Sequence, residues 1–462
     1  MRPHDVFLSF TWSDTAEVNA LENALRAAGL RVFRDRGIDR FDGVTERLVS
    51  ALAESKVLLA YYSRHFPTRY ACQWELTSAF LAAQRFGDPR RRVLVVNPEP
   101  DGNHIAPVEL ADAAYFGRPR TEQDLARIAE RVAEMSRAAD TPLGAVRSTA
   151  PLLPRLLRPR RFVGRYRQLW AVHSALHARD LPATTPRTSA ALAVVRGPAG
   201  LGKTSLAEQY AFLFRDAFPG GVRWLDLFGK DDPAGALARF HAHVRTIAAD
   251  LGADVGDRSP EEVRDLVARR IEAARKPQLW VIDDVPPDLP AAVLDELVMP
   301  TSYVRTVLTT RSGHPGWPAP VVDLGGLTED EGTELYTEIA GSADPVELAA
   351  VRRLVQRCGG HPIVLTSVST ALRDRRSATG IAGALDAVTG TAADVLRQAA
   401  TARAPVRRHR AWRAEPVGEL VRHALLTHFG GDGQLLLRDT TANRLIKAVR
   451  AIIGHGHPSR YP

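Results

Sequence analysis

The chain has 462 residues, of which 45% are hydrophobic and 25% are charged, a composition typical of a soluble globular protein with two to four domains. No apolar run approaches the ~18 residues of a membrane span, and the first nine residues lack the apolar core of a signal peptide, so we expect a cytoplasmic protein with no membrane partner. The net charge of +8 would suit nucleic acid, but only five of the 61 basic residues are lysines, and the arginine runs at 90–92, 158–161 and 407–410 carry no interleaved aromatic residues. We therefore expect no nucleic-acid partner.

The two cysteines, Cys72 and Cys358, lie far apart in the sequence. They form neither a metal-binding spacing nor a disulfide framework, which agrees with a reducing compartment.

Strand-like and helix-like segments alternate through the first 139 residues. Apolar runs predict strands at 5–9, 31–33, 57–61 and 93–97 and a weaker one near Tyr115; helical spacing predicts helices from Thr15 and at 44–54, 71–86 and 122–136. Asp14 followed by Glu17 has the spacing of a capping box for the first helix. This alternation predicts an open parallel α/β sheet of about five strands, flavodoxin-like in kind, with a ligand site at the carboxyl ends of the strands.

One acidic residue falls in an apolar helix stripe. Cys72, Glu75, Leu76 and Ala79 recur at i, i+3, i+4 and i+7, which places a carboxylate in the register of a buried face. Such a glutamate either lies at the edge of the face in solvent, which is the commoner case, or is held in a cleft with a functional role.

Three segments resemble the signature regions of a TIR (Toll/interleukin-receptor) domain over residues 1–139: DVFLSF at 5–10, RVFRDRGIDRFDG at 31–43 and CQWEL at 72–76. The chain departs from many members of that family by carrying Ala71 where they have tryptophan. The resemblance implies that the loop after the second strand serves self-association. It also places on Glu75 the role of the glutamate that is catalytic in members that cleave NAD⁺, and puts the nucleotide cleft at Ser9, Phe10 and Asp35.

The implied chemistry needs few groups. Cleavage of the nicotinamide–ribose bond passes through an oxocarbenium-like state that one carboxylate can stabilise, and nicotinamide leaves without a general acid. The family also contains scaffolds that only assemble, so a non-catalytic TIR domain that recruits other TIR proteins remains the alternative.

Residues 140–160 are rich in proline, arginine and small residues and predict an inter-domain linker. A short apolar run at 192–195 then leads into GPAGLGKTS, a complete match to GxxxxGK[ST]. The glycines can fold around an anion, Lys203 can reach the terminal phosphates, and Thr204 can offer a hydroxyl to Mg²⁺ at the start of a helix. The predicted phosphate-binding residues are Gly197, Gly200, Gly202, Lys203, Thr204 and Ser205.

Acidic and basic residues follow two later strands. The strand at 278–282 ends in Asp283, a candidate Mg²⁺ ligand, and Asp284, a candidate for orienting the attacking water. The strand at 304–310 ends in Arg311, which could sense the terminal phosphate. Capping boxes at Ser259 and Thr328 predict two helix starts, and the pattern becomes helical beyond the second.

These motifs resemble the nucleotide-binding module of STAND ATPases of the NB-ARC type over about residues 161–380. The resemblance places the adenine pocket at Val163, Gly164, Arg165 and Pro362. It implies a switch that binds ATP or ADP with Mg²⁺: ADP holds a closed monomer, and exchange for ATP gives a homo-oligomer that clusters the attached domain.

The expected organisation is therefore a TIR domain at 1–139, a linker at 140–160, a P-loop domain at 161–325, a helical ARC-like domain at 326–385 and a C-terminal region of unknown type at 386–462. The winged helix and sensor repeats usual in this family are not evident, and no repeat period is found at the C-terminus. The trigger is thus unknown: the sensor is a separate protein, the short end replaces it, or the chain is truncated. An ATP-dependent transcription regulator would need a DNA-binding element, for which only the basic C-terminal part is a candidate.

Overall fold

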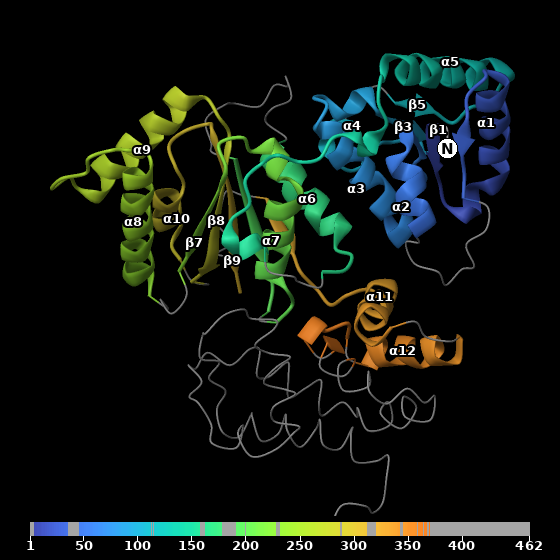
Figure 1. Cartoon of the computed structure of the whole chain (residues 1–462). Helices are drawn as coiled ribbons and strands as arrows, with labels where there is room; N and C mark the ends of the chain where they lie inside the picture. The colour runs from blue at the N-terminus through green and yellow to red at the C-terminus, as the bar shows by residue number, and fades with distance from the viewer. Residues whose placement is uncertain are drawn as a thin grey trace, which may run out of the picture.

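The computed structural model describes residues 4–35, 46–111, 113, 115–157, 162–177, 191–198, 200–227, 232–286, 289–311, 320–341, 345–357, 359–363, 365, 366 and 369. The self-association loop expected within 31–43 and the whole C-terminal region at 386–462 therefore lie mostly or wholly outside the described residues. Figure 1 shows two α/β units side by side, with two helices of a smaller helical part below them.

The first unit is a parallel sheet in the order β2-β1-β3-β4-β5. Its strands are β1 His4–Ser9, β2 Val32–Phe33, β3 Ser55–Tyr61, β4 Val93–Asn97 and β5 Phe116–Gly117. Its helices are α1 Thr15–Ala27, α2 Glu46–Ala53, α3 Tyr70–Gln84, α4 Val108–Ala111 and α5 Glu122–Ala138. This order confirms the predicted flavodoxin-like sheet and places the carboxyl end of β1 in its interior.

The capping box expected at Asp14 is wrong. Asp14 is the residue before α1, but its side chain makes no cap hydrogen bond. It instead accepts hydrogen bonds from Thr11 Oγ1 at 2.5 Å and Ser63 Oγ at 2.7 Å. Hydroxyl groups from the loops after β1 and β3 thus bind the Asp14 carboxylate, which is then not available to cap the helix. The capping boxes at Ser259 and Thr328 form as predicted.

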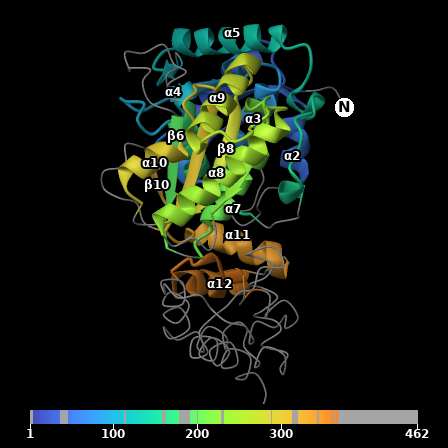
Figure 2. The same cartoon turned by 90° about the vertical axis from the view of Figure 1, so that its left-hand side faces the viewer.

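The second unit is a parallel sheet in the order β10-β6-β9-β8-β7. Its strands are β6 Ala191–Arg196, β7 Val222–Asp226, β8 Gln278–Val285, β9 Val304–Thr310 and β10 Val321–Asp323. Its helices are α6 Tyr166–His177, α7 Lys203–Leu213, α8 Pro233–Asp250, α9 Pro260–Ala274 and α10 Ala291–Leu297. Helices α8, α9 and α10 cover one face of this sheet, and α6 and α7 cover the other (Figures 1 and 2).

The helical part begins with α11 Glu329–Ala340 and α12 Pro345–Arg357, which pack against each other. Three glycines, Gly326 before α11 and Gly359 and Gly360 after α12, lie where the main chains of these two segments meet. Leu327 N donates to Gly360 O at 2.7 Å, and a Cβ on Gly326 would lie 1.9 Å from Gly359 O. We call this contact the glycine seam.

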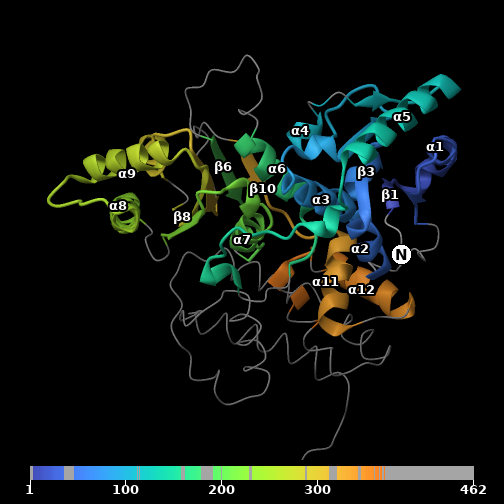
Figure 3. The same ribbon diagram turned by 45° about the horizontal axis from the view of Figure 1, so that its top comes forward.

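Helices α3 and α6 lie next to each other where the two α/β units meet (Figure 3). Buried apolar residues of both units form one continuous core there. The Phe80 and Trp170 rings lie 5.1 Å apart in an edge-on arrangement, and Trp170 packs in the same way against Phe214 of the second unit at 5.4 Å. Edge-on aromatic pairs of this kind stabilise an interface beyond their buried area. The first unit is therefore docked on the second through the helix that carries Glu75.

Among the described helices, none is both long enough and apolar enough to cross a membrane.

Candidate functional site

The Glu75 side chain lies in the interior of the first unit, with only 7% of the residue exposed. Its Oε2 accepts a hydrogen bond from Ser9 Oγ at the carboxyl end of β1. Burial raises the pKa of Glu75 to about 8; the Ser9 hydrogen bond opposes this shift and the nearby Asp35 carboxylate adds to it. This burial excludes the alternative in which Glu75 lies in solvent at the edge of the helix face. The structure also brings Glu75 near Ser9 and Asp35, two other residues expected at the same site.

A surface pocket of about 440 Å³ is lined by Trp12, Asn19, Glu22, Asn23, Arg34 and Asp35, the last of which acts electrostatically on Glu75. The guanidinium of Arg34 lies 4.5 Å from the centre of the Phe10 ring and pairs with Glu22 at 2.8 Å. Asp35 thus lines the pocket and also raises the pKa of Glu75 through its charge. The sequence analysis missed Trp12 and Arg34, which the signature segments contain or flank.

The phosphate loop leaves β6 and enters α7. Gly200 and Gly202 adopt φ values of +81° and +91°, in the left-handed region that favours glycine. Lys203, the first residue of α7, is buried and donates from Nζ to Pro198 O at 3.0 Å. Burial lowers the pKa of Lys203 to about 8, while the Asp284 carboxylate opposes that shift. A buried ammonium held by a main-chain carbonyl at a helix start is suited to binding a phosphate.

Oxygen ligands for Mg²⁺ converge next to this loop. Thr204 Oγ1 donates to Asp283 Oδ1 at 2.9 Å, and Thr309 Oγ1 donates to the same atom at 2.5 Å. Burial raises the pKa of Asp283, and its two threonine hydrogen bonds oppose the shift. A hydroxyl and a carboxylate are donors that Mg²⁺ prefers, so Thr204 and Asp283 fit this ion and would hold it beside the phosphates.

Asp284 differs from Asp283 in its backbone. Its φ is +58°, where β8 becomes irregular between Ile282 and Val285, and its N–H donates to Thr309 Oγ1 at 2.9 Å. The two acids therefore occupy different positions at one strand end, which is compatible with the two roles expected from the sequence.

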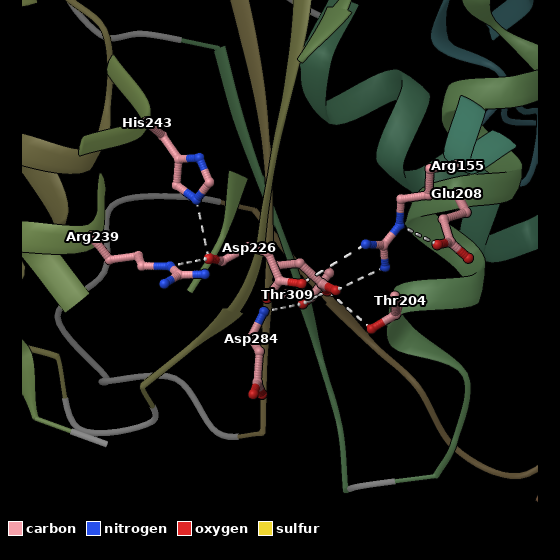
Figure 4. Close-up of polar contacts among 9 residues, drawn as sticks. Arg155, Thr204, Glu208, Asp226, Arg239, His243, Asp284 and Thr309 are labelled. Carbon is pink, nitrogen blue, oxygen red and sulfur yellow. Dashed lines mark hydrogen bonds and ion pairs between the residues drawn. The ribbon is translucent and has the colours of Figure 1, made fainter. Parts of the chain in front are cut away.

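An arginine that the sequence analysis did not select also reaches this site (Figure 4). Arg155 donates from Nε to Glu208 Oε1 at 2.6 Å, and its Nη2 lies 3.7 Å from Asp283 Oδ2. Arg155 belongs to the predicted linker. The only sequence signal is its position between leucine pairs in LLPRLL, which indicates local packing rather than a solvated linker.

The segment expected at the adenine is held close to the phosphate loop. Arg165 Nη2 donates to Gly325 O at 2.7 Å and lies 3.5 Å from Leu201 O, and Arg165 N donates to Glu331 Oε1 at 2.6 Å. A Cβ on Gly164 would lie 2.4 Å from the Glu331 side chain, and Val163 is buried. The Arg165 guanidinium thus binds main-chain carbonyls and joins the P-loop domain to the start of α11.

The residues after α12 lie directly over the phosphate loop. A Cβ on Gly200 would lie 2.8 Å from His361 Cε1, and Pro362 beside it is buried. Arg311 is exposed after β9, and its charge contributes to the lowered pKa of Lys203, so it lies within electrostatic reach of the loop. Gly197 packs against Leu324, where a Cβ would be 2.7 Å from the carbonyl oxygen, and Ser205 lies in the first turn of α7. The structure therefore gathers the expected nucleotide-binding residues from four segments.

Comparisons with known proteins identify a family for the first part of the chain. The TIR domain family model matches residues 6–129. The regulatory protein AfsR of Streptomyces griseus is 28% identical over 269 residues, which cover 57% of this chain and 26% of AfsR. The chain thus spans about a quarter of this curated relative's length.

Solved structures resemble parts of the chain. One is a signal transduction ATPase with numerous domains (STAND) protein with a tetratricopeptide repeat sensor from Pyrococcus horikoshii, at 19% identity and a TM-score of 0.36, covering 64% of this chain and 45% of that chain. Another is the TIR-domain part of the activated Roq1 resistosome, at 23% identity and a TM-score of 0.20, covering 29% of this chain and 84% of that chain. The family model identifies residues 6–129 as a TIR domain, and a parallel α/β domain that contains the GxxxxGK[ST] phosphate loop follows it.

Proposed function

We propose that the protein is a nucleotide-switched signalling protein in which ADP holds a closed form, ATP drives homo-oligomerisation, and the clustered TIR domains hydrolyse NAD⁺. The observation that carries the catalytic part is the hydrogen-bonded pair of Glu75 and Ser9, within electrostatic reach of Asp35, which lines a pocket with an arginine and an aromatic ring. The match of 57% of the chain to a regulatory protein supports a regulatory role.

The proposed reaction breaks the bond between ribose C1′ and the nicotinamide nitrogen. The electron pair leaves with neutral nicotinamide, water adds to C1′, and one proton passes to solvent. An ionised Glu75 would stabilise the positive charge that develops on the ribose. Arg34 and the aromatic rings at the pocket would hold the phosphates and the adenine.

Removing the Glu75 carboxylate tests this assignment. We expect Glu75→Ala to lower NAD⁺ turnover by at least about 100-fold, because the charge that stabilises the transition state is lost. The measurement is nicotinamide release by the full chain with Mg²⁺ and ATP, and the exposed Glu134→Ala on α5 is the matched control. Turnover that persists unchanged in Glu75→Ala would remove the catalytic role.

A scaffold function is the alternative, and one observation favours it. Glu75 is buried and its raised pKa keeps it largely neutral at pH 7, so in this closed form it offers no charge to a substrate. An ATP-bound oligomer that binds a second TIR protein while leaving NAD⁺ intact would favour the scaffold.

For the switch, the fit of Thr204 and Asp283 to Mg²⁺ and of Lys203 to phosphate supports binding of ADP or ATP. Bound Mg²⁺ would neutralise phosphate charge during hydrolysis. Asp284 would orient the attacking water, and Arg311 would respond to the terminal phosphate. We infer that hydrolysis is slow and returns the protein to its ADP state.

A further inference from the structure

Arg155 is fixed beside the nucleotide site by the packing of its neighbours. It lies in a short 3₁₀ helix, Pro154–Leu157, between α5 of the TIR domain and α6. The flanking Leu153 and Leu156 pack against the shared apolar core, and this short helix contacts α7. The backbone therefore holds the Arg155 side chain at the end of the P-loop sheet.

The guanidinium faces three carboxylates (Figure 4). Besides its hydrogen bond to Glu208, it lies 3.7 Å from Asp283 Oδ2 and 3.8 Å from Asp226 Oδ2. Its Cζ also lies 4.2 Å from the centre of the Trp224 ring, a cation–π arrangement. One cation from the linker thus partly neutralises the acidic ends of two neighbouring strands, β7 and β8.

Mg²⁺ would need the same carboxylate. Asp283 Oδ1 accepts the hydrogen bonds of Thr204 and Thr309, whereas Oδ2 faces Arg155. A divalent cation held by Thr204 and Asp283 would repel a guanidinium at this distance in a largely buried site. The linker arginine and the metal ion therefore compete for Asp283.

The same linker is attached to the TIR domain. Arg85, directly after α3, donates to Asp216 Oδ2 at 3.1 Å and to Val146 O at 3.2 Å. Ser148 Oγ donates to the other oxygen of Asp216 at 2.6 Å. A displacement at Arg155 would therefore be transmitted through residues 146–155 to the end of the helix that carries Glu75.

We propose that Arg155 is an autoinhibitory contact: in the closed form it occupies the acidic end of β8, and Mg²⁺ entering with ATP displaces it and loosens the linker that docks the TIR domain. This inference rests on the proposed nucleotide switch. It assigns to Arg155 the link between the state of the nucleotide site and the position of the TIR domain.

Binding of a non-hydrolysable ATP analogue to the full chain, measured by calorimetry with Mg²⁺ and with EDTA, tests the competition. Because Arg155 lies beside the largely buried Asp283 carboxylate, we expect Arg155→Gln to tighten the Mg²⁺-dependent binding by about fivefold and to leave binding in EDTA within about twofold. Arg155→Lys, which keeps the charge, should bind like the wild type. The matched control is Arg223→Gln, which removes the neighbouring ion pair between β7 and Asp250.

Hydrogen exchange of the linker tests the transmission. Mg²⁺ with a non-hydrolysable ATP analogue should raise exchange of residues 146–157 in the wild type, whereas ADP should not. Arg155→Gln should show the raised exchange without nucleotide. If Arg155→Gln has the same nucleotide affinity and the same hydrogen exchange as the wild type, the role of Arg155 is wrong while the proposed nucleotide switch stands. If Arg155→Gln binds nucleotide more weakly both with and without Mg²⁺, the inference is also wrong, because Arg155 would then act as a phosphate ligand. A wild-type chain that does not bind the ATP analogue with Mg²⁺ overturns the proposed switch and the inference together.

Discussion

The Glu75 carboxyl group lies in surroundings that favour its neutral form. Burial is the main cause, and its raised pKa of about 8 makes the folded TIR domain bind one more proton than the unfolded chain over a wide pH range. Catalysis of the proposed kind needs the ionised form. The described structure therefore opposes the ionised state in which Glu75 would act.

The pH dependence of stability follows from this shift. Glu75 has an ordinary pKa of 4.5 and a folded pKa of about 8, so the folded state holds the extra proton between these values and stability falls as pH rises through that window. Glu75→Gln cannot ionise but can still accept the hydrogen bond from Ser9. We expect its melting temperature to rise relative to that of the wild type as pH increases across the window, measured by calorimetry. A constant difference would show that Glu75 is not held neutral.

At the residue level, the motif positions were predictable because their spacing is local. The phosphate loop, Asp283 and Glu75 each lie in a short signature next to a strand or in one helix turn. The role of Arg155 was not predictable, because its partners Glu208, Asp226 and Asp283 lie 53 or more residues away and only the fold brings them together. The capping box predicted at Asp14 does not form for the same reason: Ser63, which donates to the Asp14 carboxylate, lies after β3, far away in the sequence.

At the level of elements, α6 joins the two α/β units by packing on α3 and α4. His173 on α6 is fully buried; its Nε2 lies 2.9 Å from Glu109 Oε1 of the TIR domain and its Nδ1 lies 3.1 Å from Tyr210 Oη of the P-loop domain. Glu109, His173 and His177 each have a ligand atom within 4.8 Å of the others, as a metal site would require. Because both His173 nitrogens already have partners, we assign this group a hydrogen-bonding role.

Removing Glu109 should therefore weaken the docking of the TIR domain. Glu109→Ala leaves a buried His173 nitrogen without its partner, which costs about 1–3 kcal/mol. We expect faster cleavage of the linker between α5 and α6 by a protease, followed by gel analysis. Glu99→Ala removes a surface pair with Arg64 on the same domain and should have little effect. Equal cleavage of both variants would mean that Glu109 does not hold the interface.

The order of both sheets could be expected only in part. Alternating strands and helices predicted a parallel sheet, and the first order agrees with the flavodoxin-like expectation. The three-residue β10 was not predicted because its run is too short to stand out, and its pairing with β6 depends on contacts between distant segments. The long helix α8 was also missed; its start is hidden in a glycine-rich and proline-containing stretch.

At the scale of the whole molecule, one face of the TIR domain is covered by the P-loop domain. The packing of α3 and α4 on α6 keeps that face from a second chain in the described form. Assembly through this face would require undocking, whereas assembly through another face would not. ATP-driven clustering and release of the TIR domain are therefore separable steps.

Lys203→Ala tests whether assembly depends on the nucleotide. Loss of the buried ammonium removes the charge for the terminal phosphates, so we expect no ATP binding and no ATP-dependent increase in mass by light scattering. Lys276→Ala, an exposed lysine before β8, is the control. Mass and NAD⁺ turnover measured together with ADP and with ATP would distinguish enzyme from scaffold. An ATP-dependent oligomer of Lys203→Ala would contradict the switch.

The glycine seam has a consequence for the residence time of a nucleotide. His361 lies over the phosphate loop, and the main-chain contacts of Gly326, Leu327 and Gly360 fix the segment that carries it. A bound nucleotide could leave only after these contacts separate, so the rate of exchange would be set by the opening of a backbone contact rather than by the strength of phosphate binding. The lifetime of the closed form would then be set by how fast the helical part opens, although this part contains neither the phosphate loop nor the TIR domain.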